Sequence, residues 1–260
     1  MHQMHPDELK AKVQSQFGAS TEHYATSDVH ARGESLGVLL EMVTPESPWR
    51  ALDVATGAGH TALAIAPHVA NVCATDLTPG MVATVERLAA ERGIENLEAR
   101  VADAEALPFD DASFDLVTCR LAFHHFPQPE RAARQFARVL RSGGKLAFTD
   151  NVTVDDASAA RIYNEYEKIR DPSHHCVLPR ASLCELLESA GFSIDATRQL
   201  AKEFEFHVWA DRQHVSDADK RRLLDLMRNI PPALDPLFQP RWADGTMYFS
   251  LWEIVLVATR

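Results

Sequence analysis

Residues 53–60, with the sequence Asp-Val-Ala-Thr-Gly-Ala-Gly-His, constrain the fold of this chain more than any other stretch. An apolar run at 51–55 overlaps them, and an alanine-rich run at 61–66 follows. This pattern predicts a short buried strand, a glycine turn and the start of a helix. Gly57 and Gly59 can adopt positive φ and carry no Cβ, so the backbone can approach a ligand closely beside the free N–H groups of a helix N-terminus. We therefore expect a nucleotide-binding turn.

Two acidic residues frame this turn. The glycines, as Gly57-x-Gly59-x-x-Ala62, also fit the looser dinucleotide fingerprint. Asp53, however, lies inside the first predicted strand, where the dinucleotide pattern usually has an apolar residue. Asp76 ends the next predicted strand, about twenty residues past the glycines, a position from which a carboxylate accepts hydrogen bonds from ribose hydroxyls. Both acids are therefore candidate ligands of a nucleotide.

Strands and helices alternate along most of the chain. After the first strand, apolar runs predict further strands at residues 71–75, 97–102, 113–119 and 146–150. Helices are expected between them, at about 78–92 and 128–140. This rhythm indicates a doubly wound α/β fold, in which ligands bind beyond the carboxyl ends of the strands.

Several phrases of the sequence resemble the Rossmann-like (class I) S-adenosylmethionine-dependent methyltransferases. The first motif of that family is an acidic residue followed by x-Gly-x-Gly-x-Gly. Here Ala55 replaces the first glycine, as in the small-molecule branch near the ubiquinone and menaquinone biosynthesis C-methyltransferases. Further phrases that match lie at residues 103–109, 113–117, 141–146 and 190–192. Together they span residues 50–192 in the expected order.

The resemblance implies a seven-stranded, mostly parallel sheet of order 3-2-1-4-5-7-6, with one antiparallel strand and helices on both faces. We expect a single methyltransferase domain over residues 1–260. Residues 1–45 would form a helical cap over the cofactor site, and an insertion at 151–180 would form a helical lid. Beyond the lid we expect a sixth strand at 194–206, a charged helix at 211–229 and a last strand at 248–258.

The resemblance also implies that S-adenosylmethionine is the cofactor. Asp76 would bind the ribose and Leu77 would pack on the adenine. Asp103 would accept from the adenine amino group, and the backbone N–H of Ala104 would bond a ring nitrogen. Asp53 would fix the turn and the methionine amino group. The full set expected at the cofactor is Asp53, Ala55, Thr56, Gly57, Gly59, Asp76, Leu77, Asp103, Ala104, Arg120 and Leu121.

His124 and His125 are the candidate catalytic residues. They follow the fourth predicted strand, at the end of the sheet where the reactive methyl group would lie. An imidazole can take a proton from a nucleophile near neutral pH, so either could act as a general base. The same His-His-Phe phrase accompanies different substrates in this branch, which favours a positioning role.

Candidate acceptor-binding residues come from the predicted cap and lid and from the segment after the fourth strand. They are Tyr24, His125, Tyr166 and His174, with Phe17, Tyr163 and His175 as further pocket candidates. The phrase His174-His175-Cys176 has no partner pair at metal-like spacing, so we expect no metal site.

The charge and composition of the chain disfavour nucleic acids and membranes as partners. The net charge of −11, from 26 basic and 37 acidic residues, disfavours a nucleic-acid substrate, which would want a basic face. The N-terminal residues contain no apolar signal region, and the apolar runs are too interrupted for a membrane span. The four cysteines show no CxxC spacing, as expected of thiols in a reducing compartment, so we expect a cytoplasmic protein. The oligomeric state is left open, with a homodimer among the options.

The function that these features favour is methyl transfer to a small, partly apolar acceptor by in-line displacement, with C- or O-methylation preferred. A nicotinamide-dependent reductase is the alternative enzyme. Such short-chain enzymes commonly use Tyr-x-x-x-Lys, whereas Tyr163 is followed by Glu167 and Tyr166 by Arg170. A non-catalytic S-adenosylmethionine-binding protein is the third hypothesis.

Overall fold

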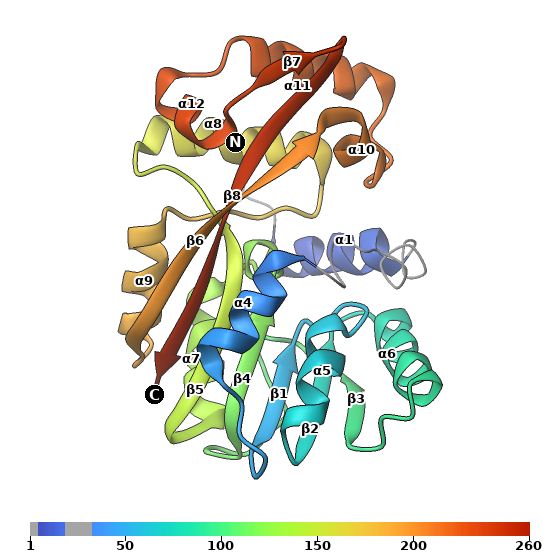
Figure 1. Cartoon of the computed structure of the whole chain (residues 1–260), viewed down its shortest axis with the longest axis vertical. Coiled ribbons are helices and arrows are strands. Elements are labelled where there is room, and N and C mark those ends of the chain that lie inside the picture. Colours follow the sequence, from blue (N-terminus) through green and yellow to red (C-terminus); the bar gives the residue numbers. More distant parts are fainter. Residues whose placement is uncertain (1–4, 19–32) are drawn as a thin grey trace.

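The computed structural model describes residues 5–18 and 33–260. Within these ranges the chain forms one eight-stranded sheet of order β3-β2-β1-β4-β5-β8-β6, with β7 paired to β8 (Figure 1). The strands are β1 (Arg50–Val54), β2 (Asn71–Asp76), β3 (Leu97–Val101), β4 (Phe114–Arg120), β5 (Leu140–Val152), β6 (Ser193–Glu205), β7 (Arg241–Ala243) and β8 (Thr246–Thr259). Strand β8 runs antiparallel to β5 and β6. The expected strand order is confirmed, with the short β7 as an addition.

Helices cover both faces of the sheet. The helices of the described residues are α1 (Pro6–Gly18), α4 (Glu34–Val43), α5 (His60–Ile65), α6 (Pro79–Glu91), α7 (Pro129–Val139), α8 (Ala157–Arg170), α9 (Arg180–Ser189), α10 (Phe206–Asp211), α11 (Asp217–Arg228) and α12 (Asp235–Phe238), with short 3-10 turns at η1 (Ala66–His68), η2 (Phe123–His125) and η3 (Pro232–Leu234). Leu39 of α4 and Ile65 of α5 pack in one apolar cluster, and Phe136 of α7 and Leu187 of α9 pack in another. The sheet therefore separates two apolar cores, as in doubly wound folds.

The glycine turn that was expected before the fifth strand is built into β5 itself. Gly143 adopts φ 75°, and a Cβ on Gly144 would lie 2.9 Å from the Arg141 carbonyl oxygen. The pairing of β4 with β5 shifts register at this point, between Phe114 and Leu116. No side chain fits at Gly144, which explains the glycine there.

A third apolar core lies beyond the sheet, in a part of the molecule that we call the distal lobe (residues 157–177 and 202–251). Figure 1 shows it above the strands, with α8, α10, α11, α12 and β7 around the far ends of β6 and β8. Tyr166, Trp209, Phe238 and Phe249 form its centre. Strand β8 pairs with β5 only through residues 252–259. Its earlier residues extend beyond β5 into the distal lobe, where they still pair with β6.

The distal lobe is larger than the lid expected at residues 151–180. The helix expected at 211–229 is α11, which begins only at Asp217 because Ser216 caps it by accepting from the Asp219 N–H at 3.1 Å. The short helix α10 precedes it, directly after β6. His214, just before this cap, adopts φ 55° and ends the preceding turn. Residues 206–243 thus join α8 in one lobe instead of forming a helix and a long turn.

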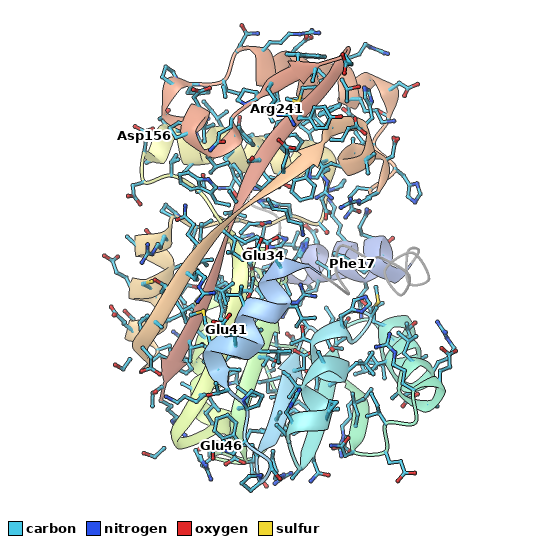
Figure 2. All side chains as sticks on the ribbon, viewed as in Figure 1. Phe17, Glu34, Glu41, Glu46, Asp156 and Arg241 are labelled. Carbon is cyan, nitrogen blue, oxygen red and sulfur yellow. The ribbon has the colours of Figure 1, made fainter. Side chains whose placement is uncertain are left out.

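Helix α1 crosses between the sheet and the distal lobe (Figures 1 and 2). Its side chains reach both parts: Gln14 donates to the Leu77 carbonyl at 2.9 Å, and Gln16 donates to Gln213 of the distal lobe at 2.7 Å. Among the described residues, no helix has the length and apolarity needed to cross a membrane.

Candidate functional site

A cavity of about 220 Å³ lies where the carboxyl ends of the parallel strands meet α1 and the distal lobe. Most residues expected at the cofactor and methyl group line it. They are Asp53, Ala55, Thr56, Gly57, Asp76, Leu77, Asp103, Ala104, Arg120, Leu121, His124 and His125. Tyr24 lies outside the described residues. The cavity occupies the place expected for ligands in an open α/β sheet.

Asp76 holds the glycine turn from the end of β2. One carboxylate oxygen accepts from the Gly57 N–H at 2.9 Å, and the other accepts from the Thr78 N–H at 2.8 Å. Burial raises the pKa of this carboxyl, while these backbone donors act in the opposite direction. Gly57 adopts φ 55° and Ala55 adopts φ 52°, a region that costs a residue with a Cβ about 1 kcal/mol or more. The left-handed backbone at Ala55 accounts for the glycine that the methyltransferase motif has there.

Gly59 serves packing rather than the cavity. It begins α5 with φ 83°, and a Cβ at this position would lie 2.9 Å from a methyl group of Val85 in α6. The expected role of Gly59 at the cofactor thus differs from its place in the structure, where it lets α5 and α6 approach each other.

Asp53 links β1 to its neighbours. Its carboxylate accepts from Thr56 of the turn and from Thr118 of β4, both at 2.5 Å. Burial raises the pKa of Asp53 to about 6, although the two hydroxyls and the nearby Arg120 lower it. The Arg120 guanidinium itself donates to Thr61 of α5 at 3.0 Å. These contacts hold Asp53, Thr56 and Arg120 in place where they line the cavity.

Helix α1 closes the cavity over Asp103. The Lys10 ammonium lies 2.7 Å from the Asp103 carboxylate and 2.5 Å from that of Glu105. Burial acts to lower the pKa of Lys10, but the two carboxylates outweigh it and raise the pKa. Lys10 and Gln14 were not among the expected site residues. The sequence signal that could have indicated them is their four-residue spacing, which places both side chains on one face of a helix.

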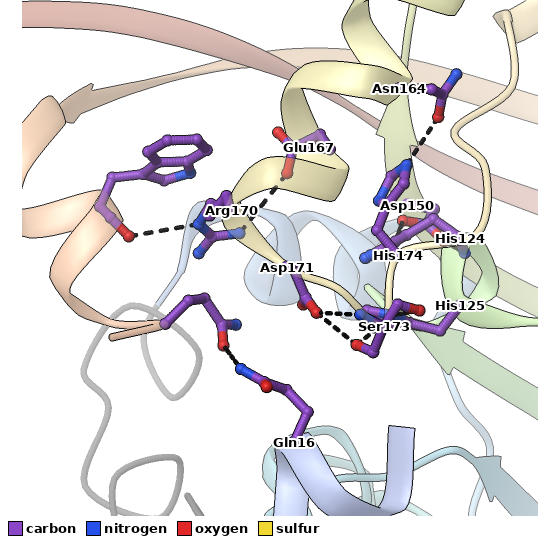
Figure 3. A network of polar contacts seen from close by, with 12 residues as sticks. Gln16, His124, His125, Asp150, Asn164, Glu167, Arg170, Asp171, Ser173 and His174 are labelled. Carbon is purple, nitrogen blue, oxygen red and sulfur yellow. Dashed lines mark hydrogen bonds and ion pairs between the residues drawn. The ribbon is translucent and has the colours of Figure 1, made fainter. Parts of the chain in front are cut away.

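His124 is held by Asp150 at the end of β5. The imidazole Nδ1 lies 2.5 Å from one Asp150 oxygen, and the His124 backbone N–H donates to the other at 2.9 Å (Figure 3). Burial would lower the pKa of His124, but Asp150, with Glu167 and Asp171 further away, outweighs it and raises the pKa. Asp150 ends a predicted strand, yet it was not among the expected site residues.

His125 contacts the other parts that surround the cavity. Its Nδ1 lies 3.1 Å from the Ser173 carbonyl oxygen, and its ring meets the edge of Phe17 of α1 with centroids 5.1 Å apart. Burial and the neighbouring His124 lower the pKa of His125 to about 4. Asp171, which accepts from the Ser173 N–H at 2.8 Å, also lines the cavity.

Two residues expected at the acceptor have other places in the structure. Tyr166 is buried in the distal lobe, where its ring stacks on Trp209 with centroids 5.3 Å apart. His174 is buried behind His124 and contacts the Asn164 amide oxygen at 2.7 Å (Figure 3). Neither lines the cavity. Tyr166 faces inward because α8 packs on the rest of the distal lobe, a contact that residues 151–180 alone do not reveal. His174 lies between Asn164 and the ring of His124.

Comparison with known proteins shows which family the chain resembles. A family model described as a methyltransferase domain matches residues 52–148. The uncharacterized methyltransferase YcgJ of Bacillus subtilis is 39% identical over 158 residues, and the demethylmenaquinone methyltransferase of Thermus thermophilus is 34% identical over 142. These matches cover 61% and 54% of this chain, and they span 62% of the length of each relative.

Solved structures are similar over more of the chain. A Bacillus halodurans protein assigned as a methyltransferase is 35% identical with a TM-score of 0.83, and the match covers 87% of this chain and 99% of that one. The YcgJ structure is 27% identical with a TM-score of 0.81, and covers 87% and 97%. The part of the chain left uncovered is shorter than the distal lobe, so both matches extend into this lobe.

Proposed function

The chain belongs to the class I S-adenosylmethionine-dependent methyltransferases, with S-adenosylmethionine as the cofactor, and from this premise we propose that it methylates a small-molecule acceptor. The observation that carries the proposal is that the glycine turn, the strand-end aspartates and the two adjacent histidines line one cavity. That cavity is about 220 Å³ and is covered by α1 and the distal lobe, so its dimensions suit a small molecule better than a polymer.

The residues present fit the cofactor. No described atom lies within 4 Å of a Cβ placed on Gly57, so there is open space beside this backbone. Asp76 uses each carboxylate oxygen for one backbone donor, and the remaining lone pairs can accept from ribose hydroxyls. Asp103 would likewise accept from the adenine, with the Ala104 N–H beside it and Leu77 against the ring. Asp53, Arg120 and the turn would surround the methionine part.

The chemistry asks little of the protein beyond alignment. S-adenosylmethionine supplies a methyl group already activated by its sulfonium, so the protein must orient the nucleophile in line and exclude water. His124 takes the proton that an acceptor hydroxyl or enol loses, and Asp150 holds the ring and stabilises the imidazolium. His125, whose pKa is lowered to about 4, stays neutral and orients the acceptor by hydrogen bonding. A hydroxyl or an enol acceptor corresponds to O- or C-methylation.

The two covers of the cavity act together in this proposal. Within the cap expected at residues 1–45, α1 is the described part that contacts the cofactor half, through Lys10, and the distal lobe, through Gln16. The insertion at 151–180 is the part of the lid that brings Asp171 to the cavity. Closure of both would exclude water during transfer.

The remaining expectations concern partners and location. The net charge of −11 supports an acceptor other than nucleic acid. All four cysteines lie within the described ranges and are free thiols, which supports a cytoplasmic location.

The proposal is tested by following the methyl group. Purified protein is incubated with methyl-labelled S-adenosylmethionine and a bacterial extract, which is then separated into small molecules and macromolecules. We expect label in the small-molecule fraction, with S-adenosylhomocysteine formed in equal amount, and a large loss of both in Asp76→Ala. Asp195→Ala, which alters a surface ion pair with Lys145, should leave both unchanged. Label confined to protein or RNA would contradict the proposal.

A further inference from the structure

The turn that directly follows α8 contacts His125, and it is fixed at both ends. At its start, the Asp171 N–H donates to the Glu167 carbonyl of α8 at 2.8 Å and ends the helix. At its far end, the His175 N–H donates to the His124 carbonyl at 2.9 Å. The turn therefore connects the distal lobe directly to the pair of histidines at the cavity.

Within this turn, Asp171 accepts both hydrogen-bond donors of Ser173. One Asp171 carboxylate oxygen lies 2.8 Å from the Ser173 nitrogen and 2.5 Å from its hydroxyl oxygen (Figure 3). Burial raises the pKa of Asp171, but His125, the two Ser173 donors and Arg170 together outweigh it and lower the pKa. An ionised carboxylate can only accept, so the Ser173 hydroxyl gives its proton to the bond with Asp171.

His125 consequently meets two oxygens of Ser173 that offer lone pairs. Its Nδ1 lies 3.1 Å from the Ser173 carbonyl oxygen and 3.3 Å from the hydroxyl oxygen. A carbonyl cannot donate, and the hydroxyl already donates to Asp171, so Nδ1 must carry the ring proton. The turn thus selects one of the two tautomers of the neutral imidazole and leaves a lone pair on Nε2.

The other ring nitrogen of His125 is available to a ligand. His125 lines the cavity, and within the described residues its Nε2 has no hydrogen-bonding partner. Burial and the neighbouring His124 lower the pKa of His125 to about 4, so the ring is neutral near pH 7. A neutral ring with its proton on Nδ1 accepts at Nε2 and cannot donate there.

We propose that Asp171 and Ser173 are positioning residues for methyl transfer: they hold the proton of His125 on Nδ1, so that Nε2 accepts from an O–H or N–H of the methyl acceptor. The inference rests on the proposed function and narrows its substrate class. Because His124 takes the proton that the methylated group loses, the donor that His125 meets is a second one. The two imidazole centroids lie 4.2 Å apart, so both donors belong to neighbouring parts of the acceptor.

Substitution of Asp171 separates this role from simple packing. In Asp171→Ala the Ser173 hydroxyl becomes free to donate to Nδ1, so the ring proton can lie on Nε2, where it faces the donor of the acceptor. Asp171→Asn keeps an amide oxygen that accepts from Ser173, so it should preserve the wild-type tautomer. Asp225→Ala, which removes an exposed aspartate of the distal lobe paired with Arg228, is the matched control.

The tautomer is read by NMR of protein with isotopically labelled histidine nitrogens, alone and saturated with S-adenosylhomocysteine. The His125 signals are assigned by their absence from His125→Gln. We expect a protonated Nδ1 and an unprotonated Nε2 in the wild type, in Asp171→Asn and in Asp225→Ala. In Asp171→Ala we expect a substantial share of the proton on Nε2.

Catechol and phenol, which carry two hydroxyls and one, then probe the available nitrogen in protein saturated with S-adenosylhomocysteine. Their aromatic ring suits Phe204 and Trp209, which line the same cavity. We expect catechol to bind several-fold more tightly than phenol and to shift the Nε2 resonance of His125. Asp171→Ala should lose most of this preference, whereas Asp225→Ala should keep it.

A proton on Nε2 of His125 in the wild type would overturn the inference, as would a tautomer that Asp171→Ala leaves unchanged. Equal affinities for catechol and phenol, or no binding of catechol up to about 10 mM, would also overturn it. Should Asp171→Ala fail to fold, the wild-type tautomer and the comparison of catechol with phenol still decide. Methyl transfer to macromolecules alone would instead refute the proposed function, and the tautomer would remain measurable.

Discussion

Four aspartates stand at the carboxyl ends of parallel strands, and each holds a different part of the site. Asp53 joins β1 to β4, Asp76 holds the glycine turn, Asp103 meets Lys10 of α1, and Asp150 holds His124. Every one of them already accepts a hydrogen bond from the protein. The carboxylates are therefore in position before any ligand arrives, which lowers the entropy lost on binding.

The pair of His124 and Asp150 predicts a pH dependence. The pKa of His124 lies above its ordinary value of 6.5, and Asp150→Asn should move it below that value, since burial then prevails. The stability that protonated His124 contributes is present below pH 6.5 and is lost as the pH rises through the folded-state pKa. Imidazole NMR titration of both proteins measures this. A His124 pKa unchanged by Asp150→Asn, or below 6.5 in both proteins, would show that Asp150 does not tune the ring.

Whether the place of a single residue could be predicted depends on how far away in the sequence its contact partners lie. Asp53 and Asp76 were identifiable from sequence because they stand near the glycine turn, in the strand before it and at the end of the next strand, and Asp103 was identified from the resemblance of residues 103–109 to the family. Lys10 contacts Asp103 across 93 residues, and no local pattern contains such a pair. The buried place of Tyr166 likewise depends on Trp209, which comes from another element.

At the scale of elements, α1 is the part of the cavity wall that contacts both halves of the molecule. Its contact with the sheet side depends on Lys10 and Gln14 and on the ring of Phe17 against His125, and Gln16 contacts the distal lobe. Only Leu9 of this helix is buried. A helix with so little buried apolar surface opens at low cost, which suits a cover that must admit ligands.

Lys10→Met should loosen α1. The change removes the ammonium between the Asp103 and Glu105 carboxylates and leaves two like charges facing each other. We expect amide hydrogen exchange in residues 6–18 to become several-fold faster, and bound S-adenosylmethionine to slow it again. Lys12→Met, on an exposed position of the same helix, is the control and should change little. Equal protection in both variants would mean that the ion pairs do not hold the helix.

Elements with a local signal were predicted well. The helix expected to stop at Gly93 ends at Glu91, with Gly93 at φ 64°. The first four strands were placed to within a residue or two for the same reason, whereas β5 begins six residues before the expected start at 146. The distal lobe was not predicted, because residues 206–243 contain short helices whose apolar faces become recognisable only when they pack on α8 and the far end of β8.

At the scale of the whole molecule, two long strands connect the sheet with the distal lobe. β6 and β8, of 13 and 14 residues, run through the sheet and on into the distal lobe, so both parts share backbone hydrogen bonds. The apolar cluster of the lobe begins where that of the sheet ends, and Trp252 packs against both. We infer that the two parts fold as one cooperative unit.

Phe238→Ala tests this cooperativity. Phe238 is 1% exposed and contacts Tyr163, Tyr166 and Phe249, so its truncation should cost about 3 to 5 kcal/mol of unfolding free energy. We expect a single denaturation transition, shifted as a whole, by both near-UV and far-UV circular dichroism. Trp242→Ala, at a half-exposed position of the same lobe, should shift it little. Two separate transitions would mean that the distal lobe unfolds by itself.

The central claim is that the cavity at the strand ends binds S-adenosylmethionine through Asp76. Isothermal titration with S-adenosylmethionine, S-adenosylhomocysteine and NADH tests it, with Asp76→Ala and the surface variant Asp195→Ala alongside. We expect saturable binding of both adenosyl ligands, weakened by about 1 to 3 kcal/mol in Asp76→Ala and unchanged in Asp195→Ala. Binding of NADH in place of the adenosyl ligands, or an affinity unaffected by Asp76→Ala, would contradict the claim.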